Sequence, residues 1–236
     1  MIRNAIAALT ATALAASPAL PCAAPAMLVF DGSASMDEIS FETGPNTRIV
    51  EARQAIRRAM PEITPHREVG LVIYGPGGAD SCSGIEVRFP PAPDTAAEII
   101  QEIGALRPSG LTPLSAAVER AAQVLDYQTQ PAVVVLVTDG NETCGGRPCA
   151  LGQRLAETAQ DLTVHVIGFR AVVDFFSWNN PEQDPTTNAT VARCLADLNG
   201  GLFVSTETVD ALVDALNQTL GCALIGRLEG AERAFN

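Results

Sequence analysis

Hydrophobic and polar positions along the chain follow two alternating patterns. Apolar segments predict strands at 26–30, 69–74, 162–169 and 202–205, and the continuous β-branched run at 131–137 is typical of a strand buried on both faces. Segments with apolar residues at helical spacing predict helices over 48–60, 94–106, 114–125, 149–159, 188–198 and 209–220, the first ending at Pro61. A further run, 85–89, follows the strand at 69–74 after a short stretch rich in Gly, Pro, Ser and Asp, which indicates an antiparallel edge strand.

The order of these elements predicts the fold class. Strands that alternate with helices, around β-branched central strands, indicate an α/β fold with a doubly wound, mostly parallel sheet, helices on both faces and one antiparallel edge strand. A length of 236 residues fits one domain of this kind. Since no internal repeat or linker interrupts the pattern, we assign residues 20–222 to this domain and residues 223–236 to a C-terminal tail.

The first residues differ in character from the rest of the chain. A short basic start is followed by an Ala/Leu-rich run and by the small residues Ser17-Pro18-Ala19, which predicts a signal peptide over residues 1–19. The apolar run is too short for a comfortable membrane span. Cys22 follows Leu20-Pro21, which superficially resembles a lipoprotein signal, but Pro21 stands where that signal has a small residue. We therefore expect an exported protein, periplasmic or secreted.

Charge narrows the class of partner. The net charge of −12 argues against nucleic acid, because phosphate binding needs a basic stripe, and no such cluster is present. The six cysteines do not have the spacing of a zinc site, which needs two close Cys or His pairs. In an exported protein they are instead expected to form disulfides.

Candidate chemistry lies where apolar runs end. The run 26–30 is followed by Asp31-Gly32-Ser33-Ala34-Ser35, and 131–137 by Thr138-Asp139-Gly140, while a Gly/Pro loop brings Thr112 to the start of a helix. Open α/β sheets bind ligands at the carboxyl ends of their strands. Carboxylate and hydroxyl oxygens suit a hard cation such as Mg²⁺.

These residues resemble the metal-ion-dependent adhesion site (MIDAS) of the von Willebrand factor type A (vWA) domain. The matching positions are Asp31, Ser33 and Ser35 in the first motif, Thr112 in the second and Asp139 in the third. The resemblance covers about residues 26–220 and implies a Rossmann-like fold. It also implies that Mg²⁺ or Mn²⁺ is the cofactor, and that the Asp or Glu carboxylate of a protein partner completes the coordination shell. Some bacterial secreted members carry a Cys-rich loop like the one at 142–149.

The motifs favour binding over catalysis. The turn after the first strand has no His, Cys or Lys at useful spacing and does not form Gly-x-Ser-x-Gly. Two alternatives remain: a hydrolase that uses a metal-bound water, and a structural domain that holds no metal. Metal analysis followed by hydrolytic assays separates them. The sequence identifies neither the partner nor the oligomeric state.

Two further features have both a functional and a simpler interpretation. Glu142 and Asp37-Glu38 resemble the second cation site of some integrin β subunits, although solvated loop carboxylates are the favoured interpretation. The segment 171–187, with Phe175, Phe176 and Trp178, follows a parallel strand. Its aromatic side chains would either contact a partner or pack on their own domain, and packing on the domain is the favoured interpretation.

The cysteine pairing is predicted in two parts. The family resemblance brings the chain ends together opposite the metal, which predicts a Cys22–Cys222 bridge. For the other four cysteines three pairings are open. We favour Cys82–Cys144 with Cys149–Cys194, over a local Cys144–Cys149 bridge that leaves Cys82 to reach across the sheet.

Overall fold

The computed structural model describes residues 24–39, 45–78, 80–170, 180–182 and 190–222. The predicted signal peptide, the C-terminal tail and most of the segment 171–187 lie outside these residues, so the predictions about them stay predictions.

The described strands form one sheet in the order β3-β2-β1-β4-β5-β6. Neighbouring strands run parallel except β2 and β3, which are antiparallel. The predicted mostly parallel sheet with one antiparallel edge strand is therefore confirmed. The strands are β1 (Ala26–Asp31), β2 (Val69–Tyr74), β3 (Ile85–Ala92), β4 (Pro131–Thr138), β5 (Asp161–Phe169) and β6 (Phe203–Thr206).

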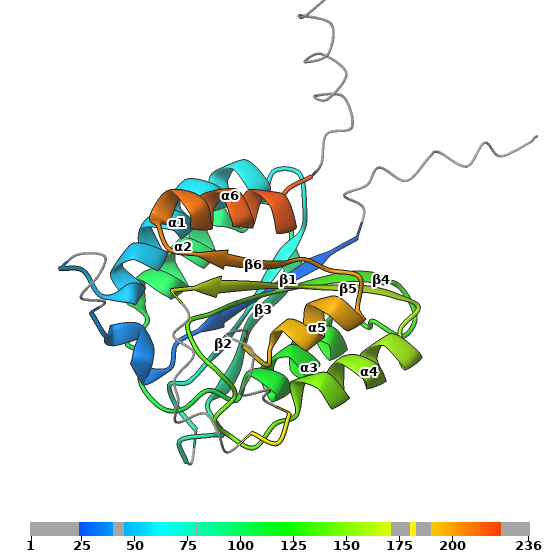
Figure 1. Ribbon diagram of the computed structural model, residues 1–236. Coiled ribbons are helices and arrows are strands. Elements are labelled where there is room, and N and C mark those ends of the chain that lie inside the picture. Colours follow the sequence, from blue (N-terminus) through cyan, green and yellow to red (C-terminus); the bar gives the residue numbers. More distant parts are fainter. Residues whose placement is uncertain (1–23, 40–44, 79, 171–179, 183–189, 223–236) are drawn as a thin grey trace, which may run out of the picture.

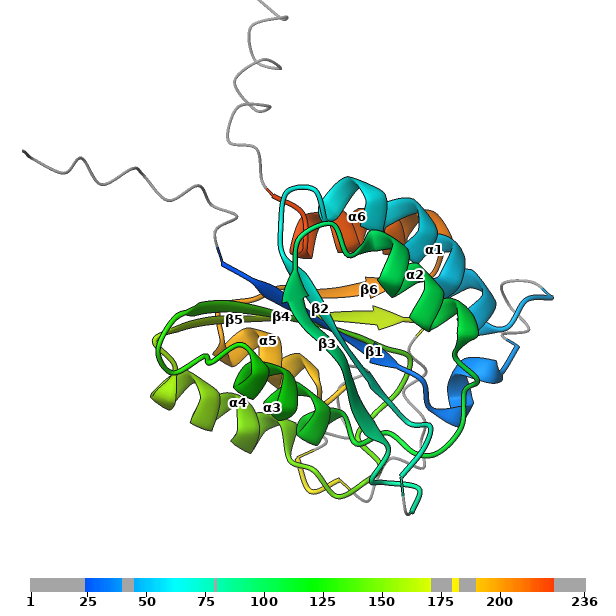
Figure 2. The same ribbon diagram turned by 180° about the vertical axis from the view of Figure 1, so that it is seen from behind.

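Helices cover both faces of the sheet (Figures 1 and 2). One layer holds α1 (Arg48–Ile63), α2 (Ala96–Ala105) and α6 (Val209–Thr219), and the other holds α3 (Leu114–Val124), α4 (Pro148–Thr158) and α5 (Arg193–Leu198). Successive side chains of a strand point to opposite faces. Accordingly, Leu28 and Phe30 of β1 pack in the core under α1, whereas Met27 and Val29 pack in the core under α3.

Two helix boundaries differ from the prediction by more than two residues. Helix α1 does not end at Pro61 but continues to Ile63, whose side chain is buried in the core, and the Thr64 N–H still donates to the Met60 carbonyl. One lost hydrogen bond in the last turn costs less than exposing Ile63. Helix α5 begins at Arg193, because the Thr190 hydroxyl donates to Asn141 and accepts from the Ala192 N–H, which holds a turn before the helix.

Strand β3 is longer than predicted. It continues through Pro90 and Pro91 to Ala92, with irregular pairing to β2. Proline is tolerated there because an edge strand has one side without a hydrogen-bonding neighbour.

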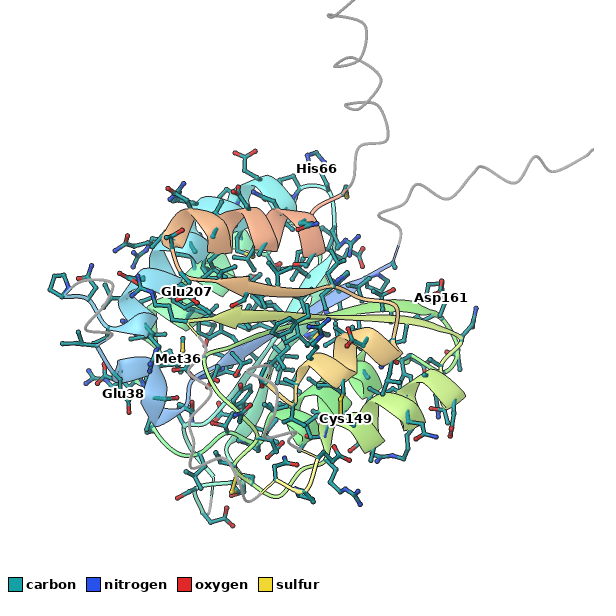
Figure 3. The ribbon with its side chains drawn as sticks, in the orientation of Figure 1. Met36, Glu38, His66, Cys149, Asp161 and Glu207 are labelled. Carbon is teal, nitrogen blue, oxygen red and sulfur yellow. A yellow bond between two sulfur atoms is a disulfide. The ribbon has the colours of Figure 1, made fainter. Side chains whose placement is uncertain are left out.

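Strands β1 and β4 form the switch point of the sheet. From β1 the chain continues on one side through β2 and β3, and it returns on the other side at β4. Phe30 pairs with Val137, so Asp31 and Thr138 follow side by side at the carboxyl ends. This edge, near Met36, Glu38 and Glu207 in Figure 3, lies opposite the edge with His66 and Asp161. In open α/β sheets the switch point at the carboxyl ends is where ligands bind.

Candidate metal centre

Asp31 ends β1 with a carboxylate that has no exposed surface. Its Oδ1 accepts the Ser33 N–H at 2.8 Å, and its Oδ2 accepts the Thr138 hydroxyl at 2.7 Å. The buried Tyr74 hydroxyl of β2 donates in turn to Thr138 at 3.0 Å. Three neighbouring strands therefore fix the orientation of the Asp31 carboxylate.

The two predicted serines connect the first motif to Asp139. After Ser33 the chain turns through the short 3-10 helix η1 (Ala34–Asp37), which brings Ser35 back towards the sheet. The Ser33 and Ser35 hydroxyl oxygens lie 3.0 Å apart, and the Ser35 hydroxyl donates to Asp139 Oδ1 at 2.8 Å. Hydrogen bonds thus join Asp31, through the Ser33 backbone, to both serines and to Asp139.

Thr112, the remaining predicted ligand, lies in a loop tied by its backbone to the other two motifs. The Ser109 N–H donates to the Gly32 carbonyl at 2.9 Å, and the Ala34 N–H donates to the Gly110 carbonyl at 3.2 Å. The Thr112 N–H donates to the Thr143 hydroxyl at 2.8 Å, four residues beyond Asp139. Thr112 is almost fully buried. The second motif is therefore held between the first and the third.

The electrostatics of the centre favour a cation. Burial, reinforced by the neighbouring charge of Asp31, raises the pKa of Asp139 well above its ordinary value. Burial and the same Asp31 charge also raise the pKa of Tyr74. Burial and the charge of Asp31 thus oppose ionisation of Asp139, and a positive ion bound beside Asp139 relieves that penalty.

The donor set fits a hard divalent ion. The described residues include no group of three or more His, Cys, Asp or Glu placed to hold a metal. The two carboxylates and the serine hydroxyls described above are all oxygen donors, which Mg²⁺ and Mn²⁺ prefer. Asp31, Ser33, Ser35, Thr112 and Asp139 remain the residues that would hold it.

Sequence reasoning missed Arg48, which lies against Asp139. The Arg48 side chain is only 7% exposed, and its Nη1 donates to Asp139 Oδ2 at 3.2 Å, to the Ser35 carbonyl at 2.9 Å and to Glu38 Oε2 at 3.1 Å. Arg48 is the first residue of α1. A cation is unfavourable at a helix N-terminus, where the dipole attracts anions. An arginine at the predicted start of a helix was thus a signal for a specific acidic neighbour.

Glu142 has a structural role rather than the expected position in solvent. It is 4% exposed, and its two carboxylate oxygens accept the Ser115 N–H at 2.9 Å and the Cys144 N–H at 2.8 Å. Ser115 lies in the first turn of α3, where a carboxylate satisfies free N–H groups and the helix dipole. Glu38 pairs with Arg48 instead. Because the carboxylates of Glu142 and Glu38 already have these partners, the structure does not favour a second cation site.

Two disulfides tie together the loops at this edge of the sheet. Cys82 pairs with Cys144, and Cys149 pairs with Cys194, which confirms the favoured pairing. The first joins the loop between β2 and β3 to the loop that follows Asp139. Cys22 lies outside the described residues, so the Cys22–Cys222 bridge stays a prediction.

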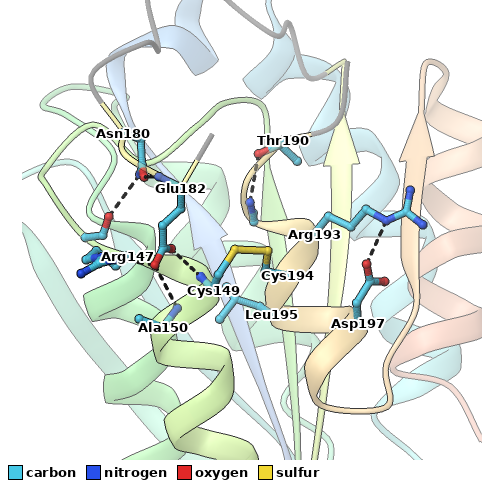
Figure 4. Close-up of a disulfide and its surroundings, with 12 residues drawn as sticks. Arg147, Cys149, Ala150, Asn180, Glu182, Thr190, Arg193, Cys194, Leu195 and Asp197 are labelled. Atoms are coloured by element: carbon cyan, nitrogen blue, oxygen red, sulfur yellow. Dashed lines mark hydrogen bonds and ion pairs between the residues drawn. A yellow bond between two sulfur atoms is a disulfide. The ribbon is translucent and has the colours of Figure 1, made fainter. Parts of the chain in front are cut away.

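The described part of the segment 171–187 contacts its own domain (Figure 4). Glu182 accepts the Cys149 N–H at 2.7 Å and the Ala150 N–H at 3.2 Å, at the N-terminus of α4. Asn180 donates to the Gly146 carbonyl at 3.1 Å. These bonds lie beside the Cys149–Cys194 disulfide and anchor Asn180–Glu182 there. Phe175, Phe176 and Trp178 lie outside the described residues.

The chain is similar to known proteins in sequence and in fold. Residues 26–142 match the model of the von Willebrand factor type A domain. The chain is 28% identical over 198 residues to the uncharacterized protein YwmD of Bacillus subtilis, covering 80% of this chain and 81% of that protein.

Solved structures share the fold. The pilus adhesin SpaC of Lactobacillus rhamnosus GG matches with a TM-score of 0.60 and 13% identity, over 84% of this chain and 30% of that one. Proximal thread matrix protein 1 of the mussel byssus, with a zinc-occupied MIDAS motif, matches with a TM-score of 0.54 and 17% identity, over 84% of this chain and 48% of that one.

Proposed function

We propose that this chain carries a von Willebrand factor type A domain, whose model residues 26–142 match, and that it is an exported, metal-dependent protein-binding module. Asp31, Ser33, Ser35, Thr112 and Asp139 hold one Mg²⁺ or Mn²⁺, with the two carboxylates acting directly or through water. An Asp or Glu side chain of a partner protein completes the coordination shell. The protein acts by binding and not as an enzyme.

One observation carries this proposal: carboxylates and hydroxyls from separate motifs meet at the switch point of the sheet. The Ser35 hydroxyl donates to Asp139 and accepts from Ser33, so one of its two lone pairs remains available to a cation. Asp31 is held by the Ser33 N–H and the Thr138 hydroxyl, which fix its carboxylate without neutralising it. The bound ion supplies an electrophilic position that attracts a carboxylate. The match to a MIDAS-containing matrix protein supports the divalent metal.

The contacts around the cluster also support binding over hydrolysis. Among the described residues, the side chains that hydrogen-bond the two carboxylates are Ser35, Arg48 and Thr138, none of which is a general base at neutral pH. Ser33 and Ser35 are assigned to the metal. A metal-assisted hydrolase is the alternative, and it predicts turnover of a phosphoester or peptide by the loaded protein.

Export is supported by the disulfides and by the adhesin and pilin structures of the same fold. Within the described ranges, the structure contains no helix that is both long and apolar enough to cross a membrane.

Metal titration of matched variants tests the site. Asp31→Asn keeps the shape of the side chain but removes its charge, so it should weaken Mn²⁺ binding more than about 100-fold in calorimetry. Asp37→Asn removes the same charge from an exposed position six residues along and should leave the affinity within about twofold. Equal Mn²⁺ affinity of wild type and Asp31→Asn would contradict the assignment of Asp31 as a metal ligand.

Partner binding is tested with the same variants. Capture of a specific protein from envelope extract should require Mg²⁺, should be lost with chelator and with Asp31→Asn, and should persist with Asp37→Asn. Full binding in chelator would contradict a metal-completed interface. Turnover of generic phosphoester or peptide substrates by the Mn²⁺-loaded wild type, lost in Asp31→Asn, would establish the hydrolase instead.

A further inference from the structure

Arg48 is a buried cation that lies directly beside a proposed metal ligand. Its Nη1 is 3.2 Å from Asp139 Oδ2, while Asp139 Oδ1 accepts the Ser35 hydroxyl. The Arg48 side chain is 7% exposed and that of Asp139 is 0% exposed. A charge pair so shielded from water interacts strongly, because solvent screening is weak.

The position of Arg48 is set by contacts other than Asp139 alone. The same Nη1 donates to the Ser35 carbonyl at 2.9 Å, and it pairs with Glu38, whose side chain is 67% exposed. Arg48 opens α1, and its N–H donates to the Glu38 carbonyl at 3.1 Å. The Ser35 carbonyl and the backbone contact to Glu38 therefore hold Arg48 against the first-motif turn independently of Asp139.

The buried charges show what this arrangement does. Asp31, Asp139 and Arg48 are all nearly inaccessible to solvent and together carry a formal charge of −1 when both carboxylates are ionised. Without Arg48 the same place would carry −2. A divalent cation therefore enters a site whose negative charge has been halved by the protein itself.

We propose that Arg48 is an internal counter-charge of Asp139 that stabilises the metal-free domain and lowers its affinity for a divalent cation. The inference rests on the metal site of the proposed function. It assigns to Arg48 a tuning role. In the metal-free protein the guanidinium neutralises part of the carboxylate charge, and when a cation binds the guanidinium repels it.

Mn²⁺ titration of three arginine variants tests this role. Arg48→Gln removes the charge but keeps an amide N–H donor for the Ser35 carbonyl, and should bind Mn²⁺ about tenfold more tightly than wild type. Arg48→Lys keeps the charge and should bind like wild type. Arg58→Met removes one positive charge from the exposed face of the same helix, where Arg58 pairs with Asp210, and should change the affinity less than about twofold.

Thermal unfolding separates tuning from a merely structural role. Metal-free Arg48→Gln should unfold at a lower temperature than wild type, and saturating Mn²⁺ should raise its unfolding temperature by more than it raises that of wild type. A structural role alone would lower the stability of both forms equally and leave the metal-induced rise unchanged. If Arg48→Gln does not fold, Arg48→Met provides the same comparison.

The outcomes distinguish this inference from the proposed function. Tighter Mn²⁺ binding and a larger metal-induced rise in Arg48→Gln support the counter-charge. Equal or weaker binding by Arg48→Gln, with normal binding by wild type and Arg58→Met, overturns it and leaves the metal site standing. No Mn²⁺ binding by wild type overturns the metal site and this inference together.

Discussion

The two buried carboxylates of the candidate centre are held by different kinds of partner. Asp31 accepts from a main-chain N–H and a threonine hydroxyl, which are dipoles, whereas Asp139 accepts from a serine hydroxyl and from the Arg48 guanidinium. A dipole fixes a carboxylate without cancelling its charge. Asp31 is therefore the stronger source of attraction for a cation, and Asp139 is the carboxylate whose contribution Arg48 adjusts.

His165 illustrates how one buried side chain makes stability depend on pH. Burial, followed by repulsion from Arg67, lowers the pKa of His165 from 6.5 to about 4, and Nδ1 accepts the Leu202 N–H at 3.0 Å, which requires the neutral ring. The unfolded chain binds the proton at higher pH than the folded chain. The folded state is therefore fully stable with respect to this group above pH 6.5, and loses stability as the pH falls from 6.5 to 4.

Replacing His165 should make the free energy of unfolding depend less on pH below neutrality. Between about pH 7 and pH 4.5, His165 should account for a loss of about 1–2 kcal/mol in the free energy of unfolding. This value is discounted because the ring is partly exposed to solvent. Urea unfolding of His165→Gln should show a smaller difference between these two pH values by that amount. The exposed His66 serves as control, and His66→Gln should behave like wild type. An unchanged difference in His165→Gln would refute the assignment.

Close backbone packing positions the metal-site loops. Gly110 has a φ of +76°, and a Cβ there would lie 2.1 Å from the Gly75 carbonyl oxygen. Gly75 is itself at φ +107°, and a Cβ there would lie 2.5 Å from the Ser33 N. Three segments therefore contact one another directly through their main chains: the second-motif loop, the loop after β2 and the first-motif turn. Any side chain at Gly110 must separate them.

A methyl group at Gly110 should damage both stability and metal binding. Gly110→Ala combines a left-handed backbone with a clash against main chain, so we expect a loss of about 2–3 kcal/mol in the free energy of unfolding. Because the loop that carries Thr112 must move, Mn²⁺ affinity should fall as well. Calorimetry and urea unfolding measure both effects.

Gly104 provides the matched control for this substitution. It lies within α2, and a Cβ there meets no atom within 4 Å. Gly104→Ala should therefore stabilise the protein by up to about 1 kcal/mol and leave metal binding unchanged. Equal effects of the two substitutions would show that the stacked loops do not hold the site.

Local patterns predicted the strands and motifs better than the helix ends and the side-chain partners. The apolar runs of β1 and β4 are buried on both faces, so they predict central strands and place Asp31 and Asp139 at the same edge of the sheet. Helix α1 continues past Pro61 because of the buried Ile63, a tertiary contact that propensity does not include. Arg48 and Glu142 are charged residues that each have a partner in a distant segment, Asp139 and Ser115, so their burial did not follow from neighbouring residues alone.

At the scale of the whole molecule, charge restricts the partner. A chain with a net charge of −12 repels an acidic protein at long range, and this repulsion is screened by salt. The three buried charges at the centre sum to −1, so a divalent ion gives +1 there. A partner carboxylate is thus attracted locally at a short distance, and complex formation should strengthen as the long-range repulsion is screened.

The ends of the described domain meet at the edge of the sheet opposite the metal centre. The Ala26 N–H donates to the Glu68 carbonyl at 2.9 Å, and Cys222 Sγ lies 3.4 Å from the His66 carbonyl oxygen. The chain therefore enters β1 and leaves α6 beside the same turn between α1 and β2. Cys22 lies four residues before β1, outside the described residues, so the arrangement of the ends agrees with the predicted Cys22–Cys222 bridge without testing it.

Peptide mapping under non-reducing conditions should recover Cys22 linked to Cys222. A bridge that closes almost the whole chain constrains the unfolded state by about 5 kcal/mol in the chain-entropy model, an upper value because strain lowers it. The double variant Cys22→Ser, Cys222→Ser should therefore unfold at a clearly lower temperature. Its Mn²⁺ affinity should equal that of wild type, because Cys222 lies at the edge of the sheet away from Asp31. Recovery of Cys22 as a free thiol, or its removal with the signal peptide, would contradict the bridge.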